Sequence, residues 1–450
     1  MAEPDSAAIS AAPMPDGMRH GYQFAFCNAI NFQIATGTPL ILFAKSLGAS
    51  STVLGILASL LSLFTFLQLF AGGYVAKLGY RKFMIGGWGL RTSMVFGLAV
   101  VPLLSFVDAP TKVALILILL VIFAILRGIA MGVWLPWITE ILPANQRGAY
   151  LSREQMSLHG GSLAALGISA LTLQYLPHPT CYSAIFLLSA FAGLASLFAL
   201  QKMPDARINE TRSTSSQRVP WREIISFPPF QKLLIFTGFW CVATASIGTF
   251  TVAYTREGLH FPESRIIFLT LSTFTGALAT LPFTARFLRW AGTKNTLRLN
   301  TFLTAMIVVG WFALAADVLP GTWWIVALLN ALFGMATSNF AVAHATLAMG
   351  VMPPMGRNHF FALFTVITSA LTGFAPIGFG ILLDALRQTT GQLGAWSINR
   401  YSLYFALIAG LVCTSGWLVN LLHEHELGTL NRRDFAIFGS LRRLGRLFGR

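Results

Sequence analysis

Apolar runs long enough to cross a bilayer dominate this sequence of 450 residues. A membrane-spanning helix needs about 20 largely apolar residues, and runs of about that length recur twelve times. We place them at residues 20–45, 51–76, 83–106, 112–139, 151–176, 180–202, 230–254, 264–289, 296–317, 321–350, 358–384 and 401–422. The expected fold is therefore an all-α membrane protein with twelve transmembrane helices.

The composition of the chain fits a protein that lipid surrounds. Only 10% of the residues are charged and 55% are hydrophobic, whereas a soluble domain of this length carries roughly 25% charged residues. A water-soluble surface cannot be built from so few charges. The sequence predicts an integral, multi-pass protein, and we expect it in the cell (inner) membrane. Residues 1–18 are polar and lack an apolar core, so no cleavable signal peptide is expected.

The positive charges predict the orientation of the chain. If the N-terminus is cytoplasmic, twenty-three of the 31 Lys and Arg fall in cytoplasmic segments and six on the opposite side, while Arg91 and Arg127 lie within spans. Cytoplasmic loops of membrane proteins carry an excess of Lys and Arg. We therefore expect both termini to be cytoplasmic. The same loops account for most of the net charge of +15, which in a soluble protein would suggest nucleic-acid binding.

Signatures of cofactor and metal chemistry are missing from the sequence. The four cysteines (Cys27, Cys181, Cys241 and Cys413) show no paired spacing. There is no Walker loop, no HExxH motif and no Cys/His cluster. We expect no cofactor, no metal and no nucleic-acid partner. Energy is predicted to come from an ion or solute gradient and not from ATP bound to this chain.

A polar stretch at residues 203–228 follows the sixth run and divides the chain into two groups of six. The expected organisation is a polar tail (1–19), a six-helix half (20–203), a cytoplasmic loop (204–228), a second six-helix half (229–423) and a basic tail (424–450). Corresponding loops of the two halves read GGYVAKLGYRK (72–82) and ARFLRWAGTK (285–294). Both combine a basic helix end, a glycine and a further basic group, as at a capped helix C-terminus.

This layout resembles the major facilitator superfamily of secondary transporters, over residues 20–423. The first loop resembles the family's Gly-small-x-x-Asp-Arg-x-Gly-Arg-Arg signature, which is matched by Gly72, Gly73, Lys77, Gly79, Arg81 and Lys82, with Ala76 at the position of the acid. The resemblance implies that this loop gates the cytoplasmic side. It also implies a solute site near the bilayer midplane, between the halves, reached by alternating access. The Gly-Pro signature of drug antiporters is absent from the fifth run, which argues against that branch.

Two arginines lie within the predicted spans. Arg127 stands just past the middle of its run, where an ionisable residue is costly and suggests a functional position. A guanidinium can bind a carboxylate or phosphate through two parallel hydrogen bonds, so Arg127 is a candidate ligand for an organic anion. The alternative is a structural arginine bonded to helix carbonyls. Arg91 lies nearer the cytoplasmic end of its run and is expected to snorkel toward water.

Uncharged polar and aromatic residues near span centres complete the candidate solute site. They are Asn28, Asn31, Thr38, Trp240, Asn330 and Thr337. Asn28, Asn31 and Thr38 of the first run lie on or beside one helical face. Asn330 and Thr337 of the tenth run share another face. Each face either lines a cavity or bonds neighbouring helices. The tryptophan either forms a wall for a sugar or planar solute or packs in the core.

Candidate proton carriers are few. No Asp or Glu lies deep in a run, and His159 and His344 are the intramembrane side chains that titrate near neutrality. Each is either a proton-linked residue or a hydrogen-bonded packing histidine. In the tail, residues 432–450 place apolar side chains on one helical side and most arginines elsewhere, which predicts an amphipathic helix on the anionic inner leaflet.

The predicted function is secondary active transport of a small organic solute by a monomeric chain. Arg127 favours an organic anion, whereas Asn31 and Trp240 suit a neutral sugar equally well. The alternative is a membrane-embedded enzyme or lipid-handling protein, but an enzyme would need clustered His, Asp or Ser near an interface, and the sequence has no such cluster. A channel usually assembles symmetric subunits around a pore, whereas two six-helix groups in one chain supply their own pathway. We therefore predict no enzymatic activity.

Overall fold

The computed structural model describes residues 15–70, 75, 77–142, 144–205, 225–351, 357–394 and 396–422. In the N-terminal part the elements are α1 (Arg19–Thr36), α2 (Thr38–Ser46), α3 (Ser51–Leu63), η1 (Phe64–Phe70), α5 (Tyr80–Val100), η2 (Val101–Leu103), α6 (Ala109–Met131), α7 (Trp134–Ile141), α8 (Ala144–Tyr175) and α9 (Thr180–Gln201). In the C-terminal part they are α11 (Pro228–Thr244), α12 (Ile247–Glu257), α13 (Glu263–Ala291), α14 (Thr293–Ala315), α15 (Trp323–Val351), α16 (Arg357–Ala385), β1 (Thr390–Leu393), β2 (Trp396–Asn399), α17 (Arg400–Leu418) and η4 (Val419–Leu421).

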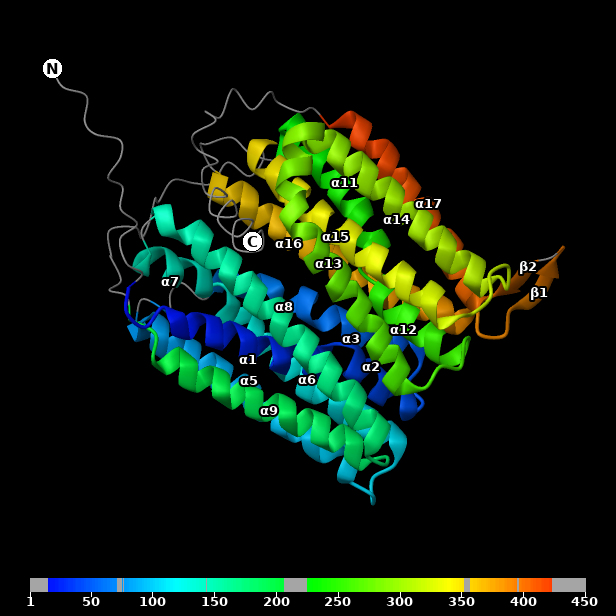
Figure 1. Cartoon of the computed structure of the whole chain (residues 1–450), viewed down its shortest axis with the longest axis horizontal. Helices are drawn as coiled ribbons and strands as arrows, with labels where there is room; N and C mark the ends of the chain where they lie inside the picture. Colours follow the sequence, from blue (N-terminus) through cyan, green and yellow to red (C-terminus); the bar gives the residue numbers. More distant parts are fainter. Residues whose placement is uncertain are drawn as a thin grey trace, which may run out of the picture.

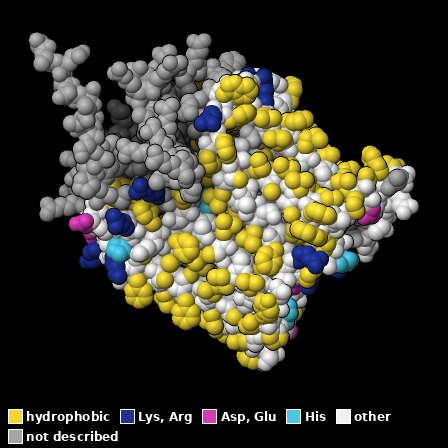
Figure 2. Space-filling model, in the orientation of Figure 1, with side chains coloured by type: hydrophobic (Ala, Val, Ile, Leu, Met, Phe, Trp, Pro, Cys, Tyr) yellow, Lys and Arg dark blue, Asp and Glu magenta, His cyan; other side chains and the backbone are white. Residues whose placement is uncertain are grey.

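Twelve helical segments within the described residues are long and apolar enough to cross a membrane. They coincide with the twelve runs found in the sequence, so the all-α, twelve-span prediction is confirmed. Hydrophobic side chains such as Phe198, Phe302 and Phe374 are exposed on helices, where lipid would surround them. Figure 2 shows hydrophobic side chains spread over the middle of one face, with most charged groups nearer the helix ends. Which end of the bundle is cytoplasmic stays a prediction.

The helices form two groups, which we call the N half (α1 to α9) and the C half (α11 to η4). In Figure 1 the N half lies at the lower left and the C half at the upper right, with α8 beside α13 and α3 beside α16 between them. Backbones approach closely at the second of these contacts. A Cβ on Gly55 would lie 2.2 Å from the Pro376 carbonyl oxygen, and one on Gly380 would lie 2.5 Å from that of Ser51. Gly380 thus allows the two helix backbones to pack closely.

The two halves repeat a local backbone conformation. Gly79 precedes α5 with φ 80° and ψ 160°, and Gly292 precedes α14 with φ 78° and ψ 165°. This region of backbone space is essentially open to glycine alone. The repeated glycine turn read from the sequence therefore corresponds to the same conformation in both halves. Gly72 and Gly73, the loop 206–224 and the tail 424–450, with its predicted amphipathic helix, lie outside the described residues.

Three features of the fold differ from a simple row of twelve helices. The first span is divided into α1 and α2 at Gly37, and the seventh is divided into α11 and α12 at Ala245 and Ser246. A β-hairpin, which the sequence analysis did not predict, connects α16 to α17, with Thr390 paired to Asn399 and Leu393 to Trp396. It projects beyond the helices at the right of Figure 1. The two divided spans are the first of each half, and both border the cavity described next.

Candidate solute cavity

Helix breaks at corresponding positions of the two halves face a common cavity. At Gly37 the chain leaves the helical region, and a Cβ there would lie 2.3 Å from the Gln33 carbonyl oxygen. Pro39 then opens α2 as one of its first residues. In the C half, the fully buried Ser246 stands between α11 and α12 and shares a 2.8 Å hydrogen bond with the Tyr404 hydroxyl. Interrupted helices at corresponding positions of two repeats point to the binding site of a transporter.

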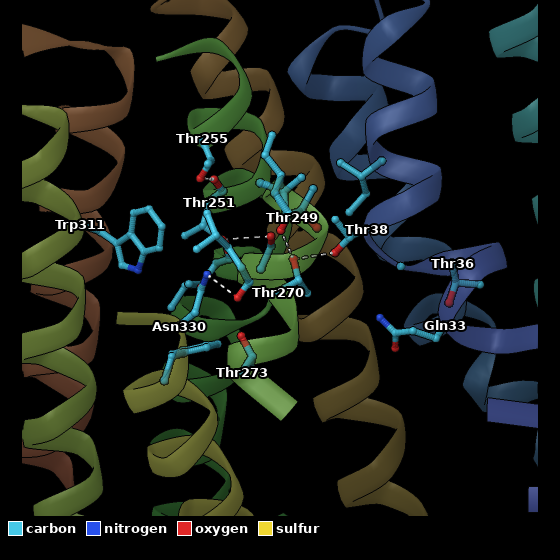
Figure 3. A pocket seen from close by; sticks show the side chains of 18 of the residues that line it. Gln33, Thr36, Thr38, Thr249, Thr251, Thr255, Thr270, Thr273, Trp311 and Asn330 are labelled. Atoms are coloured by element: carbon cyan, nitrogen blue, oxygen red, sulfur yellow. Dashed lines mark hydrogen bonds between the residues drawn. The ribbon is translucent and has the colours of Figure 1, made fainter. Parts of the chain in front are cut away.

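The cavity has a volume of about 250 Å³ and receives side chains from both halves. Its polar lining consists of Gln33, Thr36 and Thr38 of the N half and Thr249, Thr251, Thr255, Thr270, Thr273 and Asn330 of the C half, with the indole of Trp311 at one side. Figure 3 shows these threonines gathered between the helices, with Asn330 and Trp311 on the side opposite Gln33 and Thr36. A cavity of this kind offers hydroxyls, amides and one aromatic wall.

Several of the threonine hydroxyls already donate their proton to a helix carbonyl. Thr36 donates to Phe32 O at 2.8 Å, Thr251 to Ile247 O at 2.8 Å and Thr255 to Thr251 O at 2.7 Å. A hydroxyl that donates in this way keeps its two lone pairs as acceptors. These residues are therefore suited to receive hydrogen bonds from a solute that carries donors.

Other polar groups of the cavity keep a donor available. Gln33, Thr249 and Thr273 make no side-chain hydrogen bond to any described residue. Asn330 uses one N–H on Leu269 O at 3.2 Å, which leaves its second N–H and its carbonyl oxygen. Thr38 donates to the Thr270 hydroxyl at 3.3 Å and so joins the two halves across the cavity. Donors and acceptors are thus both present, as a polyhydroxylated solute requires.

The cavity lining is uncharged. None of the lining residues is Asp, Glu, Lys, Arg or His. A charged solute bound away from water would need a counter-charge or a dense set of hydrogen bonds. The lining therefore matches a neutral solute better than an ionised one.

The structure distributes the candidate residues of the sequence among different surroundings. Thr38 and Asn330 line the cavity. Thr337 lies two turns beyond Asn330 and donates to Phe333 O at 2.8 Å, and it is the phenylalanine that reaches the cavity. Trp240 is buried in the C half, where its ring stacks on Phe340 with centroids 3.6 Å apart.

Asn28 and Asn31 surround Arg91 in the interior of the N half. The guanidinium donates to Asn28 Oδ1 at 2.6 Å and to Asn31 Oδ1 at 3.1 Å, and its carbon lies over the rings of Trp88 and Phe123, 4.7 and 5.0 Å from their centroids. Arg91 is only 1% exposed. The prediction that it snorkels to water is wrong, because the asparagine carbonyls and aromatic faces supply the solvation that water would have given.

Arg127 lies on α6, partly buried, outside the lining of the cavity. Its guanidinium carbon is 4.9 Å from the centroid of the Phe32 ring on α1. It forms no ion pair with a carboxylate among the described residues. Phe32 directly precedes Gln33 in the chain, but neither Phe32 nor Arg127 is among the residues that line the cavity. An interaction with an anion at this position stays a prediction.

The two intramembrane histidines contact aromatic rings. His159 on α8 lies edge-on to Phe274 on α13, with ring centroids 6.4 Å apart, at the contact between the halves. His344 on α15 is bonded to the Thr237 hydroxyl at 2.7 Å. Both therefore have packing partners, and a role in proton coupling stays a prediction for each.

The described part of the signature loop lies at the surface. Lys77 and Lys82 are exposed, and Arg81 Nε approaches Asp205 Oδ2 of the same half at 3.6 Å. Gly79 has the positive φ already noted. These residues lie at the end of the bundle where α5 begins, and their part in gating stays a prediction.

Strong contacts join the halves at the opposite end, where α2 ends and α3 begins, which we call the distal end. Lys45 forms an ion pair with Glu257, and Tyr182 donates to Glu263 Oε2 at 2.6 Å. Asp384 accepts the Ser51 amide at 2.9 Å and both the amide and the hydroxyl of Thr52 at 2.7 Å. Three carboxylates of the C half thus hold three helix ends of the N half. We call this set the distal latch: Lys45, Ser51, Thr52, Tyr182, Glu257, Glu263 and Asp384.

Comparison with known proteins identifies the family. The sequence model of the Major Facilitator Superfamily matches residues 24–375. The chain belongs to this superfamily. It is accordingly a transporter and not an enzyme, and an integral, multi-pass membrane protein. The resemblance stated from the sequence is confirmed.

Solved transporters share the fold at low sequence identity. A mutant form of the nucleoside transporter NupG is 13% identical, with a TM-score of 0.71, and the match covers 91% of this chain and all of NupG. The xylose transporter XylE from E. coli, in an inward-open conformation, is 15% identical, with a TM-score of 0.65 over 92% of this chain and 96% of XylE. A bacterial homologue of the iron transporter ferroportin, in an inward-facing state, is 12% identical, with a TM-score of 0.67 over 90% and 97%. No curated protein matches the sequence.

The threonines of α12 and α13 are the functional candidates that the sequence analysis missed. Thr249, Thr251, Thr255, Thr270 and Thr273 lie in apolar runs in which no single position stands out as polar. The available signal was the spacing, since Thr251 and Thr255 are four residues apart, and so one helical turn, on the same face. The break between α11 and α12, which turns that face toward the cavity, has no Gly or Pro at Ala245 or Ser246, and Gly248 follows within the first turn of α12.

Proposed function

We propose that this protein carries a small, neutral, hydrogen-bonding solute across the membrane by alternating access. The observation that carries the proposal is the uncharged, threonine-rich cavity at the paired helix breaks, which both halves line. Hydroxyls and amides replace the hydration shell of a hydroxylated solute, and an indole offers an apolar face to its ring. Two of the solved relatives are named as transporters of nucleosides and of xylose, which are solutes of this chemistry.

The distal latch supports the alternating-access part of the proposal. The hydrogen bonds and ion pairs between the halves extend from Thr38, beside the cavity, to the distal end. A transporter that rocks its halves about a midplane site must break the contacts at one end in order to open that end. Because charge-assisted hydrogen bonds are short and depend on a specific geometry, they can be lost in one step as the halves tilt.

Arg127 supports a second candidate, an organic anion. The guanidinium lies over the Phe32 ring of α1 and has no carboxylate partner among the described residues. An anionic group on the solute could supply that partner through two hydrogen bonds. The uncharged lining of the cavity itself favours the neutral solute.

Uptake into proteoliposomes tests the proposal. Purified protein is reconstituted, and uptake of D-xylose, uridine and succinate is measured with and without a proton gradient. We expect uptake of at least one neutral solute. Thr249→Val and Thr273→Val keep the side-chain volume and remove hydroxyls that have no partner among the described residues, so each should raise the KM by roughly 5- to 10-fold, the effect of one hydrogen bond.

The matched control is Thr414→Val, a threonine exposed on α17 that donates to the Gly410 carbonyl and lies outside the cavity. Its KM should equal that of the parent protein. If all three variants behave alike, the cavity does not bind the solute. Uptake of succinate that is lost in both Arg127→Lys and Arg127→Gln would instead support the organic anion.

A further inference from the structure

A second polar pocket, about 190 Å³ in volume, lies in the C half beside α3 of the N half. Its lining consists of Ser62, Thr237, Cys241, His344, Phe364, Thr368, Ser369 and Thr372, which we call the His344 pocket. It shares no residue with the cavity at the helix breaks. Cys241 stands four residues before Ala245 of that cavity, which is about 6 Å along α11. The pocket is therefore a separate space, displaced along α11 toward the start of that helix.

His344 and Phe364, which line the pocket, belong to a column of stacked rings. Trp240 stacks on Phe340 (centroids 3.6 Å apart, planes at 9°), Phe340 on His344 (5.5 Å, 11°) and His344 on Phe364 (5.8 Å, 26°). Parallel rings at such distances are held by offset stacking. The column keeps the imidazole plane nearly parallel to the phenyl rings on its two sides.

A hydrogen bond fixes the rotation of the imidazole within its plane. His344 Nε2 lies 2.7 Å from the hydroxyl of Thr237, a residue of α11 that is only 3% exposed. The second ring nitrogen, Nδ1, makes no hydrogen bond to a described residue. One nitrogen of a neutral imidazole donates and the other accepts. The ring therefore has one nitrogen without a hydrogen-bond partner among the described residues.

The rest of the pocket is neutral and capable of hydrogen bonding. Hydroxyls of Ser62, Ser369 and Thr372 line it, Phe364 adds an aromatic face, and no charged side chain is among its residues. An aromatic face together with fixed hydrogen-bonding groups at the edge is the arrangement that recognises a flat heterocycle. A sugar ring, which lacks a π-system, would gain less from it.

The pocket includes one residue of the opposite half. Ser62 belongs to α3, which packs along α16, the helix of Phe364 and Ser369. A movement of one half against the other therefore changes the wall of the pocket. A ligand there would sense the conformation of the transporter.

We infer that the His344 pocket is a second binding station for the transported solute and that it selects solutes with a neutral, flat, hydrogen-bonding ring. This inference rests on the proposed function and narrows its substrate class. The solute occupies the threonine-lined cavity at one stage and the His344 pocket at another, about one to two helical turns along α11. Recognition at the second station comes from His344 Nδ1 and the serine and threonine hydroxyls.

Alkylation of Cys241 tests the second station directly. A variant carrying Cys27→Ser, Cys181→Ala and Cys413→Ser retains Cys241, which is half-buried in the pocket lining. The rate of its modification by N-ethylmaleimide is measured in detergent with uridine, nicotinamide or D-xylose added. We expect uridine or nicotinamide to slow the reaction and D-xylose to leave it unchanged. His344→Phe keeps an aromatic ring in the column and removes both ring nitrogens. The same protection of Cys241 should then need a roughly 5- to 10-fold higher concentration of uridine or nicotinamide.

A variant that retains only Cys27 is the matched control, because that thiol is half-buried on α1 outside both pockets. No solute should protect it. Equal protection of Cys241 by D-xylose, or no protection by either ring compound, overturns the inference. If uptake by the proteoliposomes is intact while Cys241 is unprotected, the second station fails and the proposed transport stands. If no solute is taken up, the proposed function fails, and protection in detergent still decides whether the pocket binds a ring.

Discussion

Arg91 and Asn31 illustrate how a buried polar cluster can resemble a binding site in the sequence. Both lie in apolar runs, where a polar residue suggests a solute contact. In the structure Asn31 is fully buried, accepts from Arg91 and donates to the Ser189 carbonyl at 2.9 Å. Its hydrogen-bonding capacity is used within the N half. The sequence showed that these residues need partners, but the partners come from helices distant in the chain, so their identity required the tertiary structure.

Glu154 is the basis of a prediction at the same scale. It is 6% exposed, and its Oε1 accepts the Trp134 indole N–H at 2.7 Å. Glu154→Gln keeps an oxygen that can accept this hydrogen bond, so its stability should be close to that of the parent protein. Glu154→Leu leaves the indole N–H buried without an acceptor, which costs about 1–3 kcal/mol. We expect thermal unfolding in detergent to place the leucine variant clearly below the glutamine variant.

The two substitutions control for each other, since both remove the negative charge and only one removes the acceptor. If both variants melt at the temperature of the parent protein, Trp134 does not depend on the carboxyl oxygen. If both melt equally far below the parent protein, the charge itself matters, through a group other than Trp134.

At the scale of elements, the positions of the twelve spans could be predicted from the sequence. The breaks within the first and the seventh span differ in how well the sequence predicts them. Span positions follow from apolar length alone, because the bilayer sets that length. The break at Gly37 has a local signal in Gly37 and Pro39. The break at Ala245 and Ser246 has only Gly248, two residues further on, and it coincides with the tertiary hydrogen bond between Ser246 and Tyr404. The local sequence signal is therefore strong at the first break and weak at the second.

The glycine turn before α5 leads to a prediction about backbone strain. Gly79 has φ 80° and ψ 160°, and a Cβ at this position would meet no described atom within 4 Å. Gly79→Ala therefore introduces no collision with the described residues, and its cost is the conformation alone, about 1–3 kcal/mol. We expect a lower melting temperature in detergent and reduced recovery of folded protein.

Gly86→Ala is the matched control for this variant. Gly86 also has open space where a methyl group would lie, but it stands within α5 and has no positive φ. Alanine is favoured over glycine in a helix by roughly 0.5–1 kcal/mol, so this variant should be at least as stable as the parent. If Gly79→Ala is equally stable, the turn does not require glycine.

At the scale of the whole molecule, the cavity arises from both halves, and this limits what its sequence could reveal. Thr38 and Asn330 were identified because each belongs to a polar helical face within an apolar run. Thr249 and Thr270 are ordinary residues in threonine-containing runs, and they acquire a role only when the halves bring α12 and α13 beside α2. The family's two-half layout could be predicted, but the composition of the surface between the halves depends on how they are placed.

The distal latch should set the balance between the two conformations of the transporter. Asp384 accepts three hydrogen bonds from the start of α3. Asp384→Asn replaces one carboxylate oxygen by an NH₂ group, which cannot accept a hydrogen bond from Ser51 or Thr52. The bonds to that position are lost, and those to the remaining oxygen weaken because the negative charge is gone. A loss of about 1.4 kcal/mol changes the ratio of the two conformations tenfold. We therefore expect the variant to populate a distal-open state that the parent protein rarely visits.

Spin-label distances measure this shift at both ends of the molecule. In a background without native cysteines, Phe106→Cys and Leu393→Cys place labels on exposed distal residues of the two halves, and Lys77→Cys and Trp290→Cys do so at the other end. In Asp384→Asn the distal distance should lengthen and the opposite distance should shorten, because rocking halves exchange one opening for the other. Asp108→Asn, at an exposed distal aspartate that is not part of the latch, should change neither distance. Lengthening at both ends would mean that the halves separate without rocking, and unchanged distances would mean that the carboxylate does not hold the distal end closed.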